Sequence, residues 1–83
     1  MYKVELTAEA RKEVKNLLKL HKKAVSLVID ELKENPVLGK PLGRELTGLF
    51  SLRVGNYRII YKINKKDKKI LVLRAGHRSK IYN

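Results

Sequence analysis

Residues 49 to 61 read Leu49-Phe50-Ser51-Leu52-Arg53-Val54-Gly55-Asn56-Tyr57-Arg58-Ile59-Ile60-Tyr61. Two runs rich in aromatic and β-branched residues flank the pair Gly55-Asn56, which suits the positive first φ of a two-residue type II′ turn. The stretch therefore predicts a β-hairpin. With that turn Arg53 lies directly opposite Arg58, and successive cross-strand pairs alternate between the two faces of the sheet.

The two faces of this hairpin differ in chemistry. One is apolar and consists of Phe50, Leu52, Val54, Tyr57, Ile59 and Tyr61, whereas the other carries Ser51, Arg53, Arg58, Ile60 and Lys62. Like charges directly opposite each other are destabilising, on the scale of about 0.2–1 kcal/mol for a cross-strand pair, so local pairing gives no reason for the two arginines. A phosphate between them would give one, because it accepts several charge-assisted hydrogen bonds from guanidinium groups. The alternative is a solvated basic face.

Length and composition predict one small domain over residues 1–83, in which 43% of residues are hydrophobic and the formal net charge is +12. Such a charge favours nucleic acid, the ribosome or an acidic protein as partner. The chain has no cysteine and two isolated histidines, which argues against disulfides, thiolate catalysis and a closed structural metal site, so we expect no metal and no cofactor. The apolar runs are short and the first residues are unlike a signal peptide, so we expect a cytoplasmic protein without membrane association.

The segment before the hairpin predicts one strand and two helices. Residues 2–6 alternate apolar and polar side chains like a half-buried strand, and Thr7 can cap a helix over residues 8–20. The apolar stripe then resets, and Val25, Val28, Ile29 and Leu32 predict a second helix that Asn35 and Pro36 end. Residues 36–48 hold both prolines and three glycines, which indicates a connecting loop.

After the hairpin come a basic turn at residues 64–69 and the apolar run 70–75, which predicts a central strand covered on both faces, next to the first strand. The order is β-α-α-β-β-β. Two amphipathic helices in a row, each with one apolar stripe, form a helical hairpin packed on a mainly antiparallel four-stranded sheet. This is a two-layer α+β fold that leaves the face with Arg53 and Arg58 open.

No phosphate loop, dinucleotide fingerprint, metal motif or serine triad is present in the sequence. The segment Gly76-His77-Arg78, which leaves the central strand, could instead bring Arg78, Tyr82 and His77 beside Arg53 and Arg58. Tyr82 could equally be a hydrophobic anchor, and His77 a simple turn residue.

These patterns resemble the RelE branch of the RelE/ParE toxin superfamily, in its archaeal type. The resemblance rests on Leu52-Arg53-Val54-Gly55-Asn56-Tyr57-Arg58-Ile59-Ile60-Tyr61, followed by Ala75-Gly76-His77-Arg78-Ser79-Lys80-Ile81-Tyr82 after two helices. It covers nearly the whole chain. It implies the toxin of a type II toxin–antitoxin pair, an mRNA interferase that cleaves mRNA in the ribosomal A site, with a RelB-like antitoxin as partner in a heterotetramer.

Carried over residue by residue, the resemblance implies that Arg58 and Arg78 contact the scissile phosphate, that Tyr82 stacks on or orients the RNA base, and that Arg53 replaces a basic strand residue. Where the bacterial RelE strand offers a lysine as general base, this sequence has Ser51 or Leu49. Lys62, Lys65, Lys66, Lys68 and Lys69 are predicted to bind RNA or the ribosome.

Such a site needs no metal, because RNA carries its own nucleophile and the protein aligns the 2′-OH, accepts its proton and stabilises charge on the phosphate. Arginine is a poor proton acceptor. His77, with an ordinary pKa near ~6.5, or a ribosomal or substrate group is therefore the predicted acceptor. Two other functions fit the sequence: a ParE-like toxin that binds DNA gyrase, and a non-catalytic ribosome- or RNA-binding module.

Overall fold

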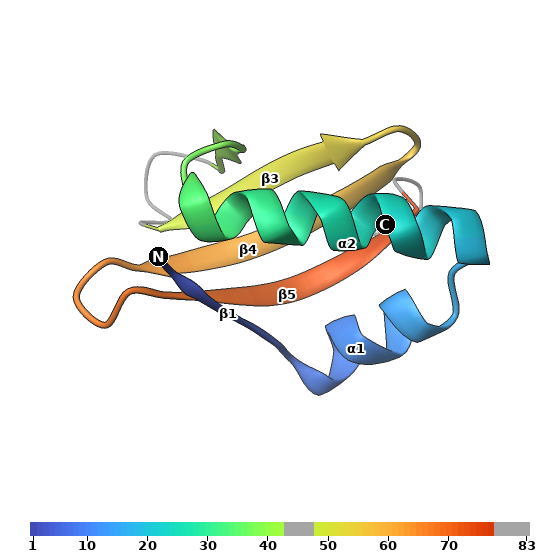
Figure 1. Cartoon of the computed structure of the whole chain (residues 1–83), viewed down its shortest axis with the longest axis horizontal. Coiled ribbons are helices and arrows are strands. Elements are labelled where there is room, and N and C mark those ends of the chain that lie inside the picture. The colour runs from blue at the N-terminus through green and yellow to red at the C-terminus, as the bar shows by residue number, and fades with distance from the viewer. Residues whose placement is uncertain (43–47, 78–83) are drawn as a thin grey trace.

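The structure is a computed structural model that describes residues 1–42 and 48–77. Its elements follow the order β1 (Lys3–Leu6), α1 (Ala8–Lys15), α2 (Lys19–Glu34), β2 (Lys40–Pro41), β3 (Leu49–Val54), β4 (Tyr57–Asn64) and β5 (Lys69–His77). The strands form one sheet in the order β1-β5-β4-β3-β2, in which only the β1–β5 pair is parallel. Both helices lie on the same side of the sheet (Figure 1). The predicted two-layer α+β fold is confirmed.

The hairpin of β3 and β4 has the predicted register. Arg53 pairs with Arg58 and Val54 with Tyr57, so Gly55 and Asn56 form the turn. Gly55 has a φ of 61°, a left-handed conformation that side chains other than glycine rarely adopt. The hairpin is therefore fixed by local sequence, and its apolar face packs beneath the helices, where Ile59 and Tyr61 are fully buried.

The sheet has five strands rather than the predicted four. The extra strand is β2, which lies within the predicted connecting loop and pairs with residues 50 and 51 of β3. Gly39 permits this close approach, because a Cβ at that position would lie 2.7 Å from the Ser51 carbonyl oxygen and 2.9 Å from the Tyr61 hydroxyl. A run of two paired residues carries no alternating hydrophobic pattern, so the sequence gives no signal for this strand.

The helix boundaries also differ from the prediction. α1 ends at Lys15 instead of reaching residue 20, and α2 begins at Lys19. The Asn16 N–H donates to the Lys12 carbonyl oxygen and the Leu17 N–H to the Val14 carbonyl oxygen at the end of α1, and Leu18 adopts an extended conformation before α2. This break lets the chain reverse, so that Ala10 of α1 and Val25 of α2 are buried in the same core. The connection between the two helices is thus three residues long, residues 16–18.

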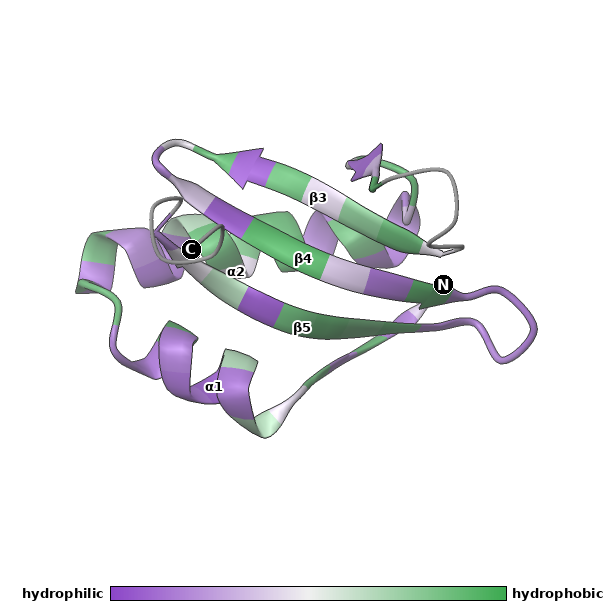
Figure 2. Ribbon diagram, turned by 180° about the vertical axis from the view of Figure 1, so that it is seen from behind, coloured by the Kyte–Doolittle hydropathy of each residue, from purple (hydrophilic) through white to green (hydrophobic). Residues whose placement is uncertain are grey.

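The strand β5 is central, between β1 and β4, but the prediction that both its faces are covered is wrong. Ile70 and Val72 are buried under the helices, whereas Leu71 points to the other side and is 38% exposed. Among the described residues no helix covers that side (Figure 2). The run of apolar residues in β5 therefore reflects strand propensity on an open face and not burial on both.

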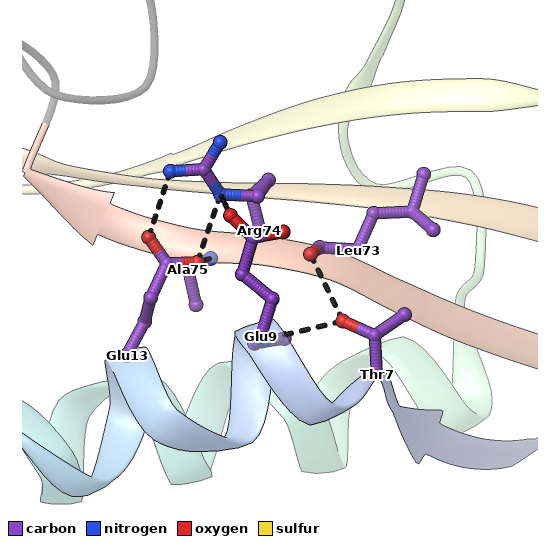
Figure 3. Close-up of polar contacts among 7 residues, drawn as sticks. Thr7, Glu9, Glu13, Leu73, Arg74 and Ala75 are labelled. Carbon is purple, nitrogen blue, oxygen red and sulfur yellow. Dashed lines mark hydrogen bonds and ion pairs between the residues drawn. The ribbon is translucent and has the colours of Figure 1, made fainter.

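The helix α1 closes the edge of β5 beyond the end of β1 (Figure 3). The Thr7 hydroxyl, confirmed as N-cap, accepts from the Ala10 N–H and donates to the Leu73 carbonyl oxygen, both at 3.0 Å. Glu13 accepts two hydrogen bonds from the Arg74 guanidinium at 3.0 Å and one from the Ala75 N–H at 3.1 Å. These bonds satisfy backbone groups that would otherwise form an open sheet edge.

Tyr61 ties the segment before β2 to the core, and its loss should be measurable. Its hydroxyl donates to the Pro36 carbonyl oxygen at 2.8 Å and accepts from the Gly39 N–H at 2.9 Å, in a residue with no exposed surface. We expect Tyr61→Phe to lower the free energy of unfolding by ~1–3 kcal/mol, because two polar groups lose their partner. Urea denaturation measures this. Tyr2→Phe is the control, and an equal loss there would contradict the assignment.

The same burial raises the pKa of Tyr61 above its ordinary value, and the hydrogen bond from Gly39 only partly offsets this. A tyrosine whose pKa is higher in the folded than in the unfolded chain stabilises the fold below the unfolded pKa of ~10, and this contribution is lost as the pH rises through the folded pKa. We therefore expect stability to fall above about pH 10 more steeply in the native chain than in Tyr61→Phe. Thermal denaturation between pH 8 and pH 11, roughly spanning that value, tests the difference.

Candidate nucleic-acid interface

A cationic groove lies on the open side of the sheet, at the end nearest the β3–β4 turn. It has a volume of about 370 Å³ and is lined by Leu38, Gly39, Lys40, Ser51, Leu52, Arg53 and Arg58. The sheet face that holds it is turned toward the viewer in Figure 2, with α2 behind. None of the described residues that line the groove carries a carboxylate, so it presents three cationic side chains to whatever enters.

The two arginines of the groove are held differently. Arg53 is exposed to solvent, whereas Arg58 is half-buried and one of its terminal nitrogens lies 3.4 Å from the Ser51 hydroxyl oxygen. Ser51 is only 5% exposed. In the β3–β4 pairing Arg58 lies opposite Arg53, and in the β4–β5 pairing it lies opposite Gly76, which has no side chain. Arg58 is thus a partly buried cation held next to Ser51, and Arg53 is an exposed cation beside it.

Lys40 is a groove residue that the sequence did not predict. It is exposed on β2 and pairs with Ser51, so the alternation of the sheet places it on the same face as Arg53 and Arg58. Lys40 lies in the groove because Gly39 approaches Ser51 and Tyr61 closely and because β2 pairs with β3 over two residues. Neither feature can be recognised as a sequence pattern. Ser51 was considered from the sequence only because it replaces a lysine that serves as general base. Its place in the groove, next to the Arg58 guanidinium, comes from the fold.

The structure does not bring His77 together with Arg53 and Arg58. His77 pairs with Tyr57, whose side chain lies on the helix-covered face, and the two rings are in edge contact at 5.8 Å between centroids. The Tyr57 hydroxyl is hydrogen-bonded to Nδ1 of His21 in α2 at 2.8 Å. His77 and Arg58 therefore lie on opposite faces of the sheet. Strand alternation explains this, because Gly76 and not His77 is the residue opposite Arg58.

The other predicted basic residues extend the cationic surface away from the groove. Those predicted to contact RNA or the ribosome are all exposed: Lys62, Lys65, Lys66, Lys68 and Lys69. Lys69 forms a long ion pair of 3.8 Å with Glu5. From Arg58 to the end of β4 the strand spans about 20 Å at ~3.3 Å per residue. Lys65, Lys66 and Lys68 in the β4–β5 turn, and Lys69 at the start of β5, are thus separated from the groove by most of the length of β4.

Arg74, although basic, is neutralised. Its guanidinium donates two hydrogen bonds to Glu13 and lies 3.2 Å from a carboxylate oxygen of Glu9, and the hydrogen bond to Glu13 is the main cause of a pKa above the ordinary value (Figure 3). Arg74 therefore stabilises the contact between α1 and β5. Arg78 and Tyr82, which the sequence predicts as phosphate and base contacts, lie outside the described residues, so their predicted roles remain predictions.

The arrangement of two helices on one side of a mainly antiparallel sheet is shared with solved chains of RelE-type toxin–antitoxin complexes. Residues 4–82 match the sequence family described as ParE toxin of type II toxin-antitoxin system, parDE, and the chain belongs to this family. The predicted membership of the RelE/ParE superfamily is confirmed. The chain is also 37% identical over 83 residues to "Toxin RelG" of Mycobacterium tuberculosis, covering 98% of this chain and 95% of that protein.

Solved structures agree with this membership. A chain of the toxin–antitoxin complex RelBE2 from Mycobacterium tuberculosis superposes with a TM-score of 0.79 at 37% identity, over 93% of this chain and 98% of that chain. A chain of the archaeal RelE–RelB complex from Pyrococcus horikoshii OT3 gives a TM-score of 0.80 at 32% identity, over 93% and 94%. No helix among the described residues is long and apolar enough to cross a membrane.

Proposed function

We propose that this chain is a toxin that cleaves mRNA in the ribosomal A site without a metal ion. The observation that carries the proposal is the groove in which Arg53 and Arg58 are paired, with Lys40 beside them and no carboxylate among the described lining residues. A phosphate is the RNA group that such a set of donors binds best. The similarity to toxins named RelG and RelE, at 37% and 36% identity, supports the RelE branch.

The proposed reaction is attack of the ribose 2′-OH on the adjacent phosphorus. The 2′-oxygen forms a bond to phosphorus as its proton leaves, and the bond to the 5′-oxygen breaks as that oxygen takes up a proton, which gives a 2′,3′-cyclic phosphate and a 5′-OH end. Arg58 stabilises the extra negative charge on the phosphate from a fixed position, and Arg53 and Lys40 add to the positive potential. Arg78 is proposed as a further phosphate contact, and Tyr82 as the residue that orients the base.

The proton acceptor is proposed to come from the ribosome or from the RNA. His77 was the acceptor that the sequence offered within this chain, but it faces the helices together with Tyr57 and His21. The remaining groove residues are arginines, a lysine, a serine and apolar groups, none of which is an effective base at neutral pH. A site that lacks its own base would be active only when the ribosome holds the substrate, which suits the proposed ribosome dependence.

The proposed partner is an acidic RelB-like antitoxin, in a heterotetramer of two toxins and two antitoxins. The two solved structures that resemble this chain at 37% and 32% identity are complexes of a RelE-type toxin with a RelB-type antitoxin. A net charge of +12 would also speed the encounter with an acidic partner. Copurification with the product of the neighbouring open reading frame tests this. A partner that is basic, or folded without the toxin, would contradict it.

Mapping of mRNA 5′ ends in a translating extract tests the function. The toxin should produce new ends within codons of translated messages, and Arg58→Ala should not, whereas Arg11→Ala on the exposed surface of α1 should behave like the native chain. The family description favours a second function, the ParE-like inhibition of DNA gyrase. Broken DNA with intact mRNA in cells that express the chain would support that function and contradict mRNA cleavage.

A further inference from the structure

The outer surface of α2 is charged against its own helix dipole. Lys19, Lys22 and Lys23 are exposed in the first turns, and the first turn contains no acidic residue. The last turns expose three carboxylates, of which Asp30 pairs with Lys33 at 3.2 Å. Helix dipoles favour the reverse order, with acids first and cations last. The order of charges on α2 is therefore unfavourable for the helix by itself and calls for a partner that compensates it.

The same surface has a protruding side chain at one end and a hollow at the other. Leu20 in the first turn is 76% exposed and Leu27 in the middle is 58% exposed. Beyond Leu27 lies a shallow hollow of about 530 Å³, lined by Leu27, Asp30, Glu31, Glu34, Asn35 and Leu38. Large apolar side chains that are exposed along one ridge mark an interaction surface. Leu20 and the hollow lie at different ends of the same helix, so Leu20 can enter such a hollow only on a second molecule.

We propose that two copies of this chain associate through α2, with the two helices antiparallel about a twofold axis near Leu27. Lys23 and Glu31 are equally far from Leu27 in sequence, so the axis places Lys23 of one copy beside Glu31 of the other. Leu20 is placed in the same way opposite the hollow next to Glu34. An antiparallel second copy has the reverse order of charges, which compensates both helices at once. Such an interface is self-complementary, as a twofold axis requires.

A net charge of +12 opposes self-association in general, but α2 contributes little to that charge. Four lysines and three carboxylates make α2 nearly neutral. The groove with Arg53 and Arg58 lies on the opposite side of the sheet, so association through α2 points the basic faces away from each other (Figures 1 and 2). An acidic partner would be attracted to the groove side and not to the acidic end of α2.

Sedimentation equilibrium of Lys23→Glu, of Glu31→Lys and of their equimolar mixture tests the proposal. Each variant alone sets like charges against each other across the axis and should be monomeric at concentrations where the native chain dimerises. In the mixture both contacts join opposite charges, so dimers should return. Both substitutions also improve the match of charges to the helix dipole, so circular dichroism should show folded variants with undiminished thermal stability.

Lys12→Glu, an equal change of charge on the exposed surface of α1, is the control and should dimerise as the native chain does. The interface is small, so the concentration series extends to about 1 mM, the weak end of measurable association. A native chain that stays monomeric over this range would overturn the proposal. So would dimerisation of the two single variants at native strength, or a mixture that remains monomeric.

Discussion

Alanine in place of Arg58 is expected to abolish toxicity and to lower the rate of single-turnover mRNA cleavage by ~10²-fold or more, the scale observed when a positioned group that stabilises the transition state is removed. Arg58 is the groove cation with the most constrained position, half-buried and within 3.4 Å of the Ser51 hydroxyl. Its fixed position means that little reorganisation is needed as charge develops on the phosphate. Binding to the ribosome should change by no more than a few-fold.

The fold should survive this substitution. The contact that is lost with Ser51 is long, and removal of the guanidinium also relieves repulsion with Arg53, so the free energy of unfolding should change by less than about 1 kcal/mol. Urea denaturation of Arg58→Ala beside Arg11→Ala, which removes an equal charge from α1, measures this. A large loss of stability at Arg58 alone would mean that the residue is structural, and the phosphate-binding role would lose its main support.

Arg58→Lys separates charge from geometry at the same position. A lysine keeps the positive charge but cannot present two parallel donors to a phosphate. If the two parallel guanidinium donors are needed, the cleavage rate of Arg58→Lys should lie between those of the native chain and Arg58→Ala. Native activity in Arg58→Lys would show that only the local potential is needed.

The sequence predicted those features that depend on neighbours along the chain. The turn at Gly55, the pairing of Arg53 with Arg58 and the cap at Thr7 are all set by a few consecutive residues, and all are confirmed. The prediction that one face of the sheet is open followed from the alternation of apolar and polar side chains along the two strands of the hairpin. The position of β1 beside β5 was predicted as well, but the sequence did not predict that these two strands are parallel.

The features that the sequence did not predict depend on contacts between distant segments. The strand β2 exists because Gly39 can approach Ser51 and Tyr61, and it is this strand that adds Lys40 to the groove. The position of His77 depends on a register shift between β4 and β5 near Ile60 and Tyr61, which fixes the faces at the end of β5. Neither effect leaves a periodic signal in the sequence.

Removal of the three lysines of the β4–β5 turn and of Lys69, the first residue of β5, is expected to weaken ribosome association strongly while cleavage at saturation persists. Gln replaces Lys65, Lys66 and Lys69, and Asn replaces Lys68, whose φ of 52° asparagine tolerates. Each lost phosphate contact should lower the slope of log affinity against log salt by about 0.7 to 0.9, so four should lower it by about 3. Binding titrations at several salt concentrations measure this. Gln at the exposed Lys12, Lys15, Lys19 and Lys22 removes equal charge from the helical side and should have a much smaller effect.

Arg78→Ala and Tyr82→Ala should show the opposite behaviour. Both residues are proposed to contact the reacting nucleotide, so each substitution should lower the single-turnover rate by ~10²-fold or more while ribosome binding stays within a few-fold of native. The turn lysines lie about 20 Å from Arg58 along β4, so they can attract RNA without touching the scissile phosphate. If the lysine variant and the two alanine variants all lose affinity and all cleave at the native rate at saturation, the chain is a ribosome-binding module, and the nuclease function is wrong.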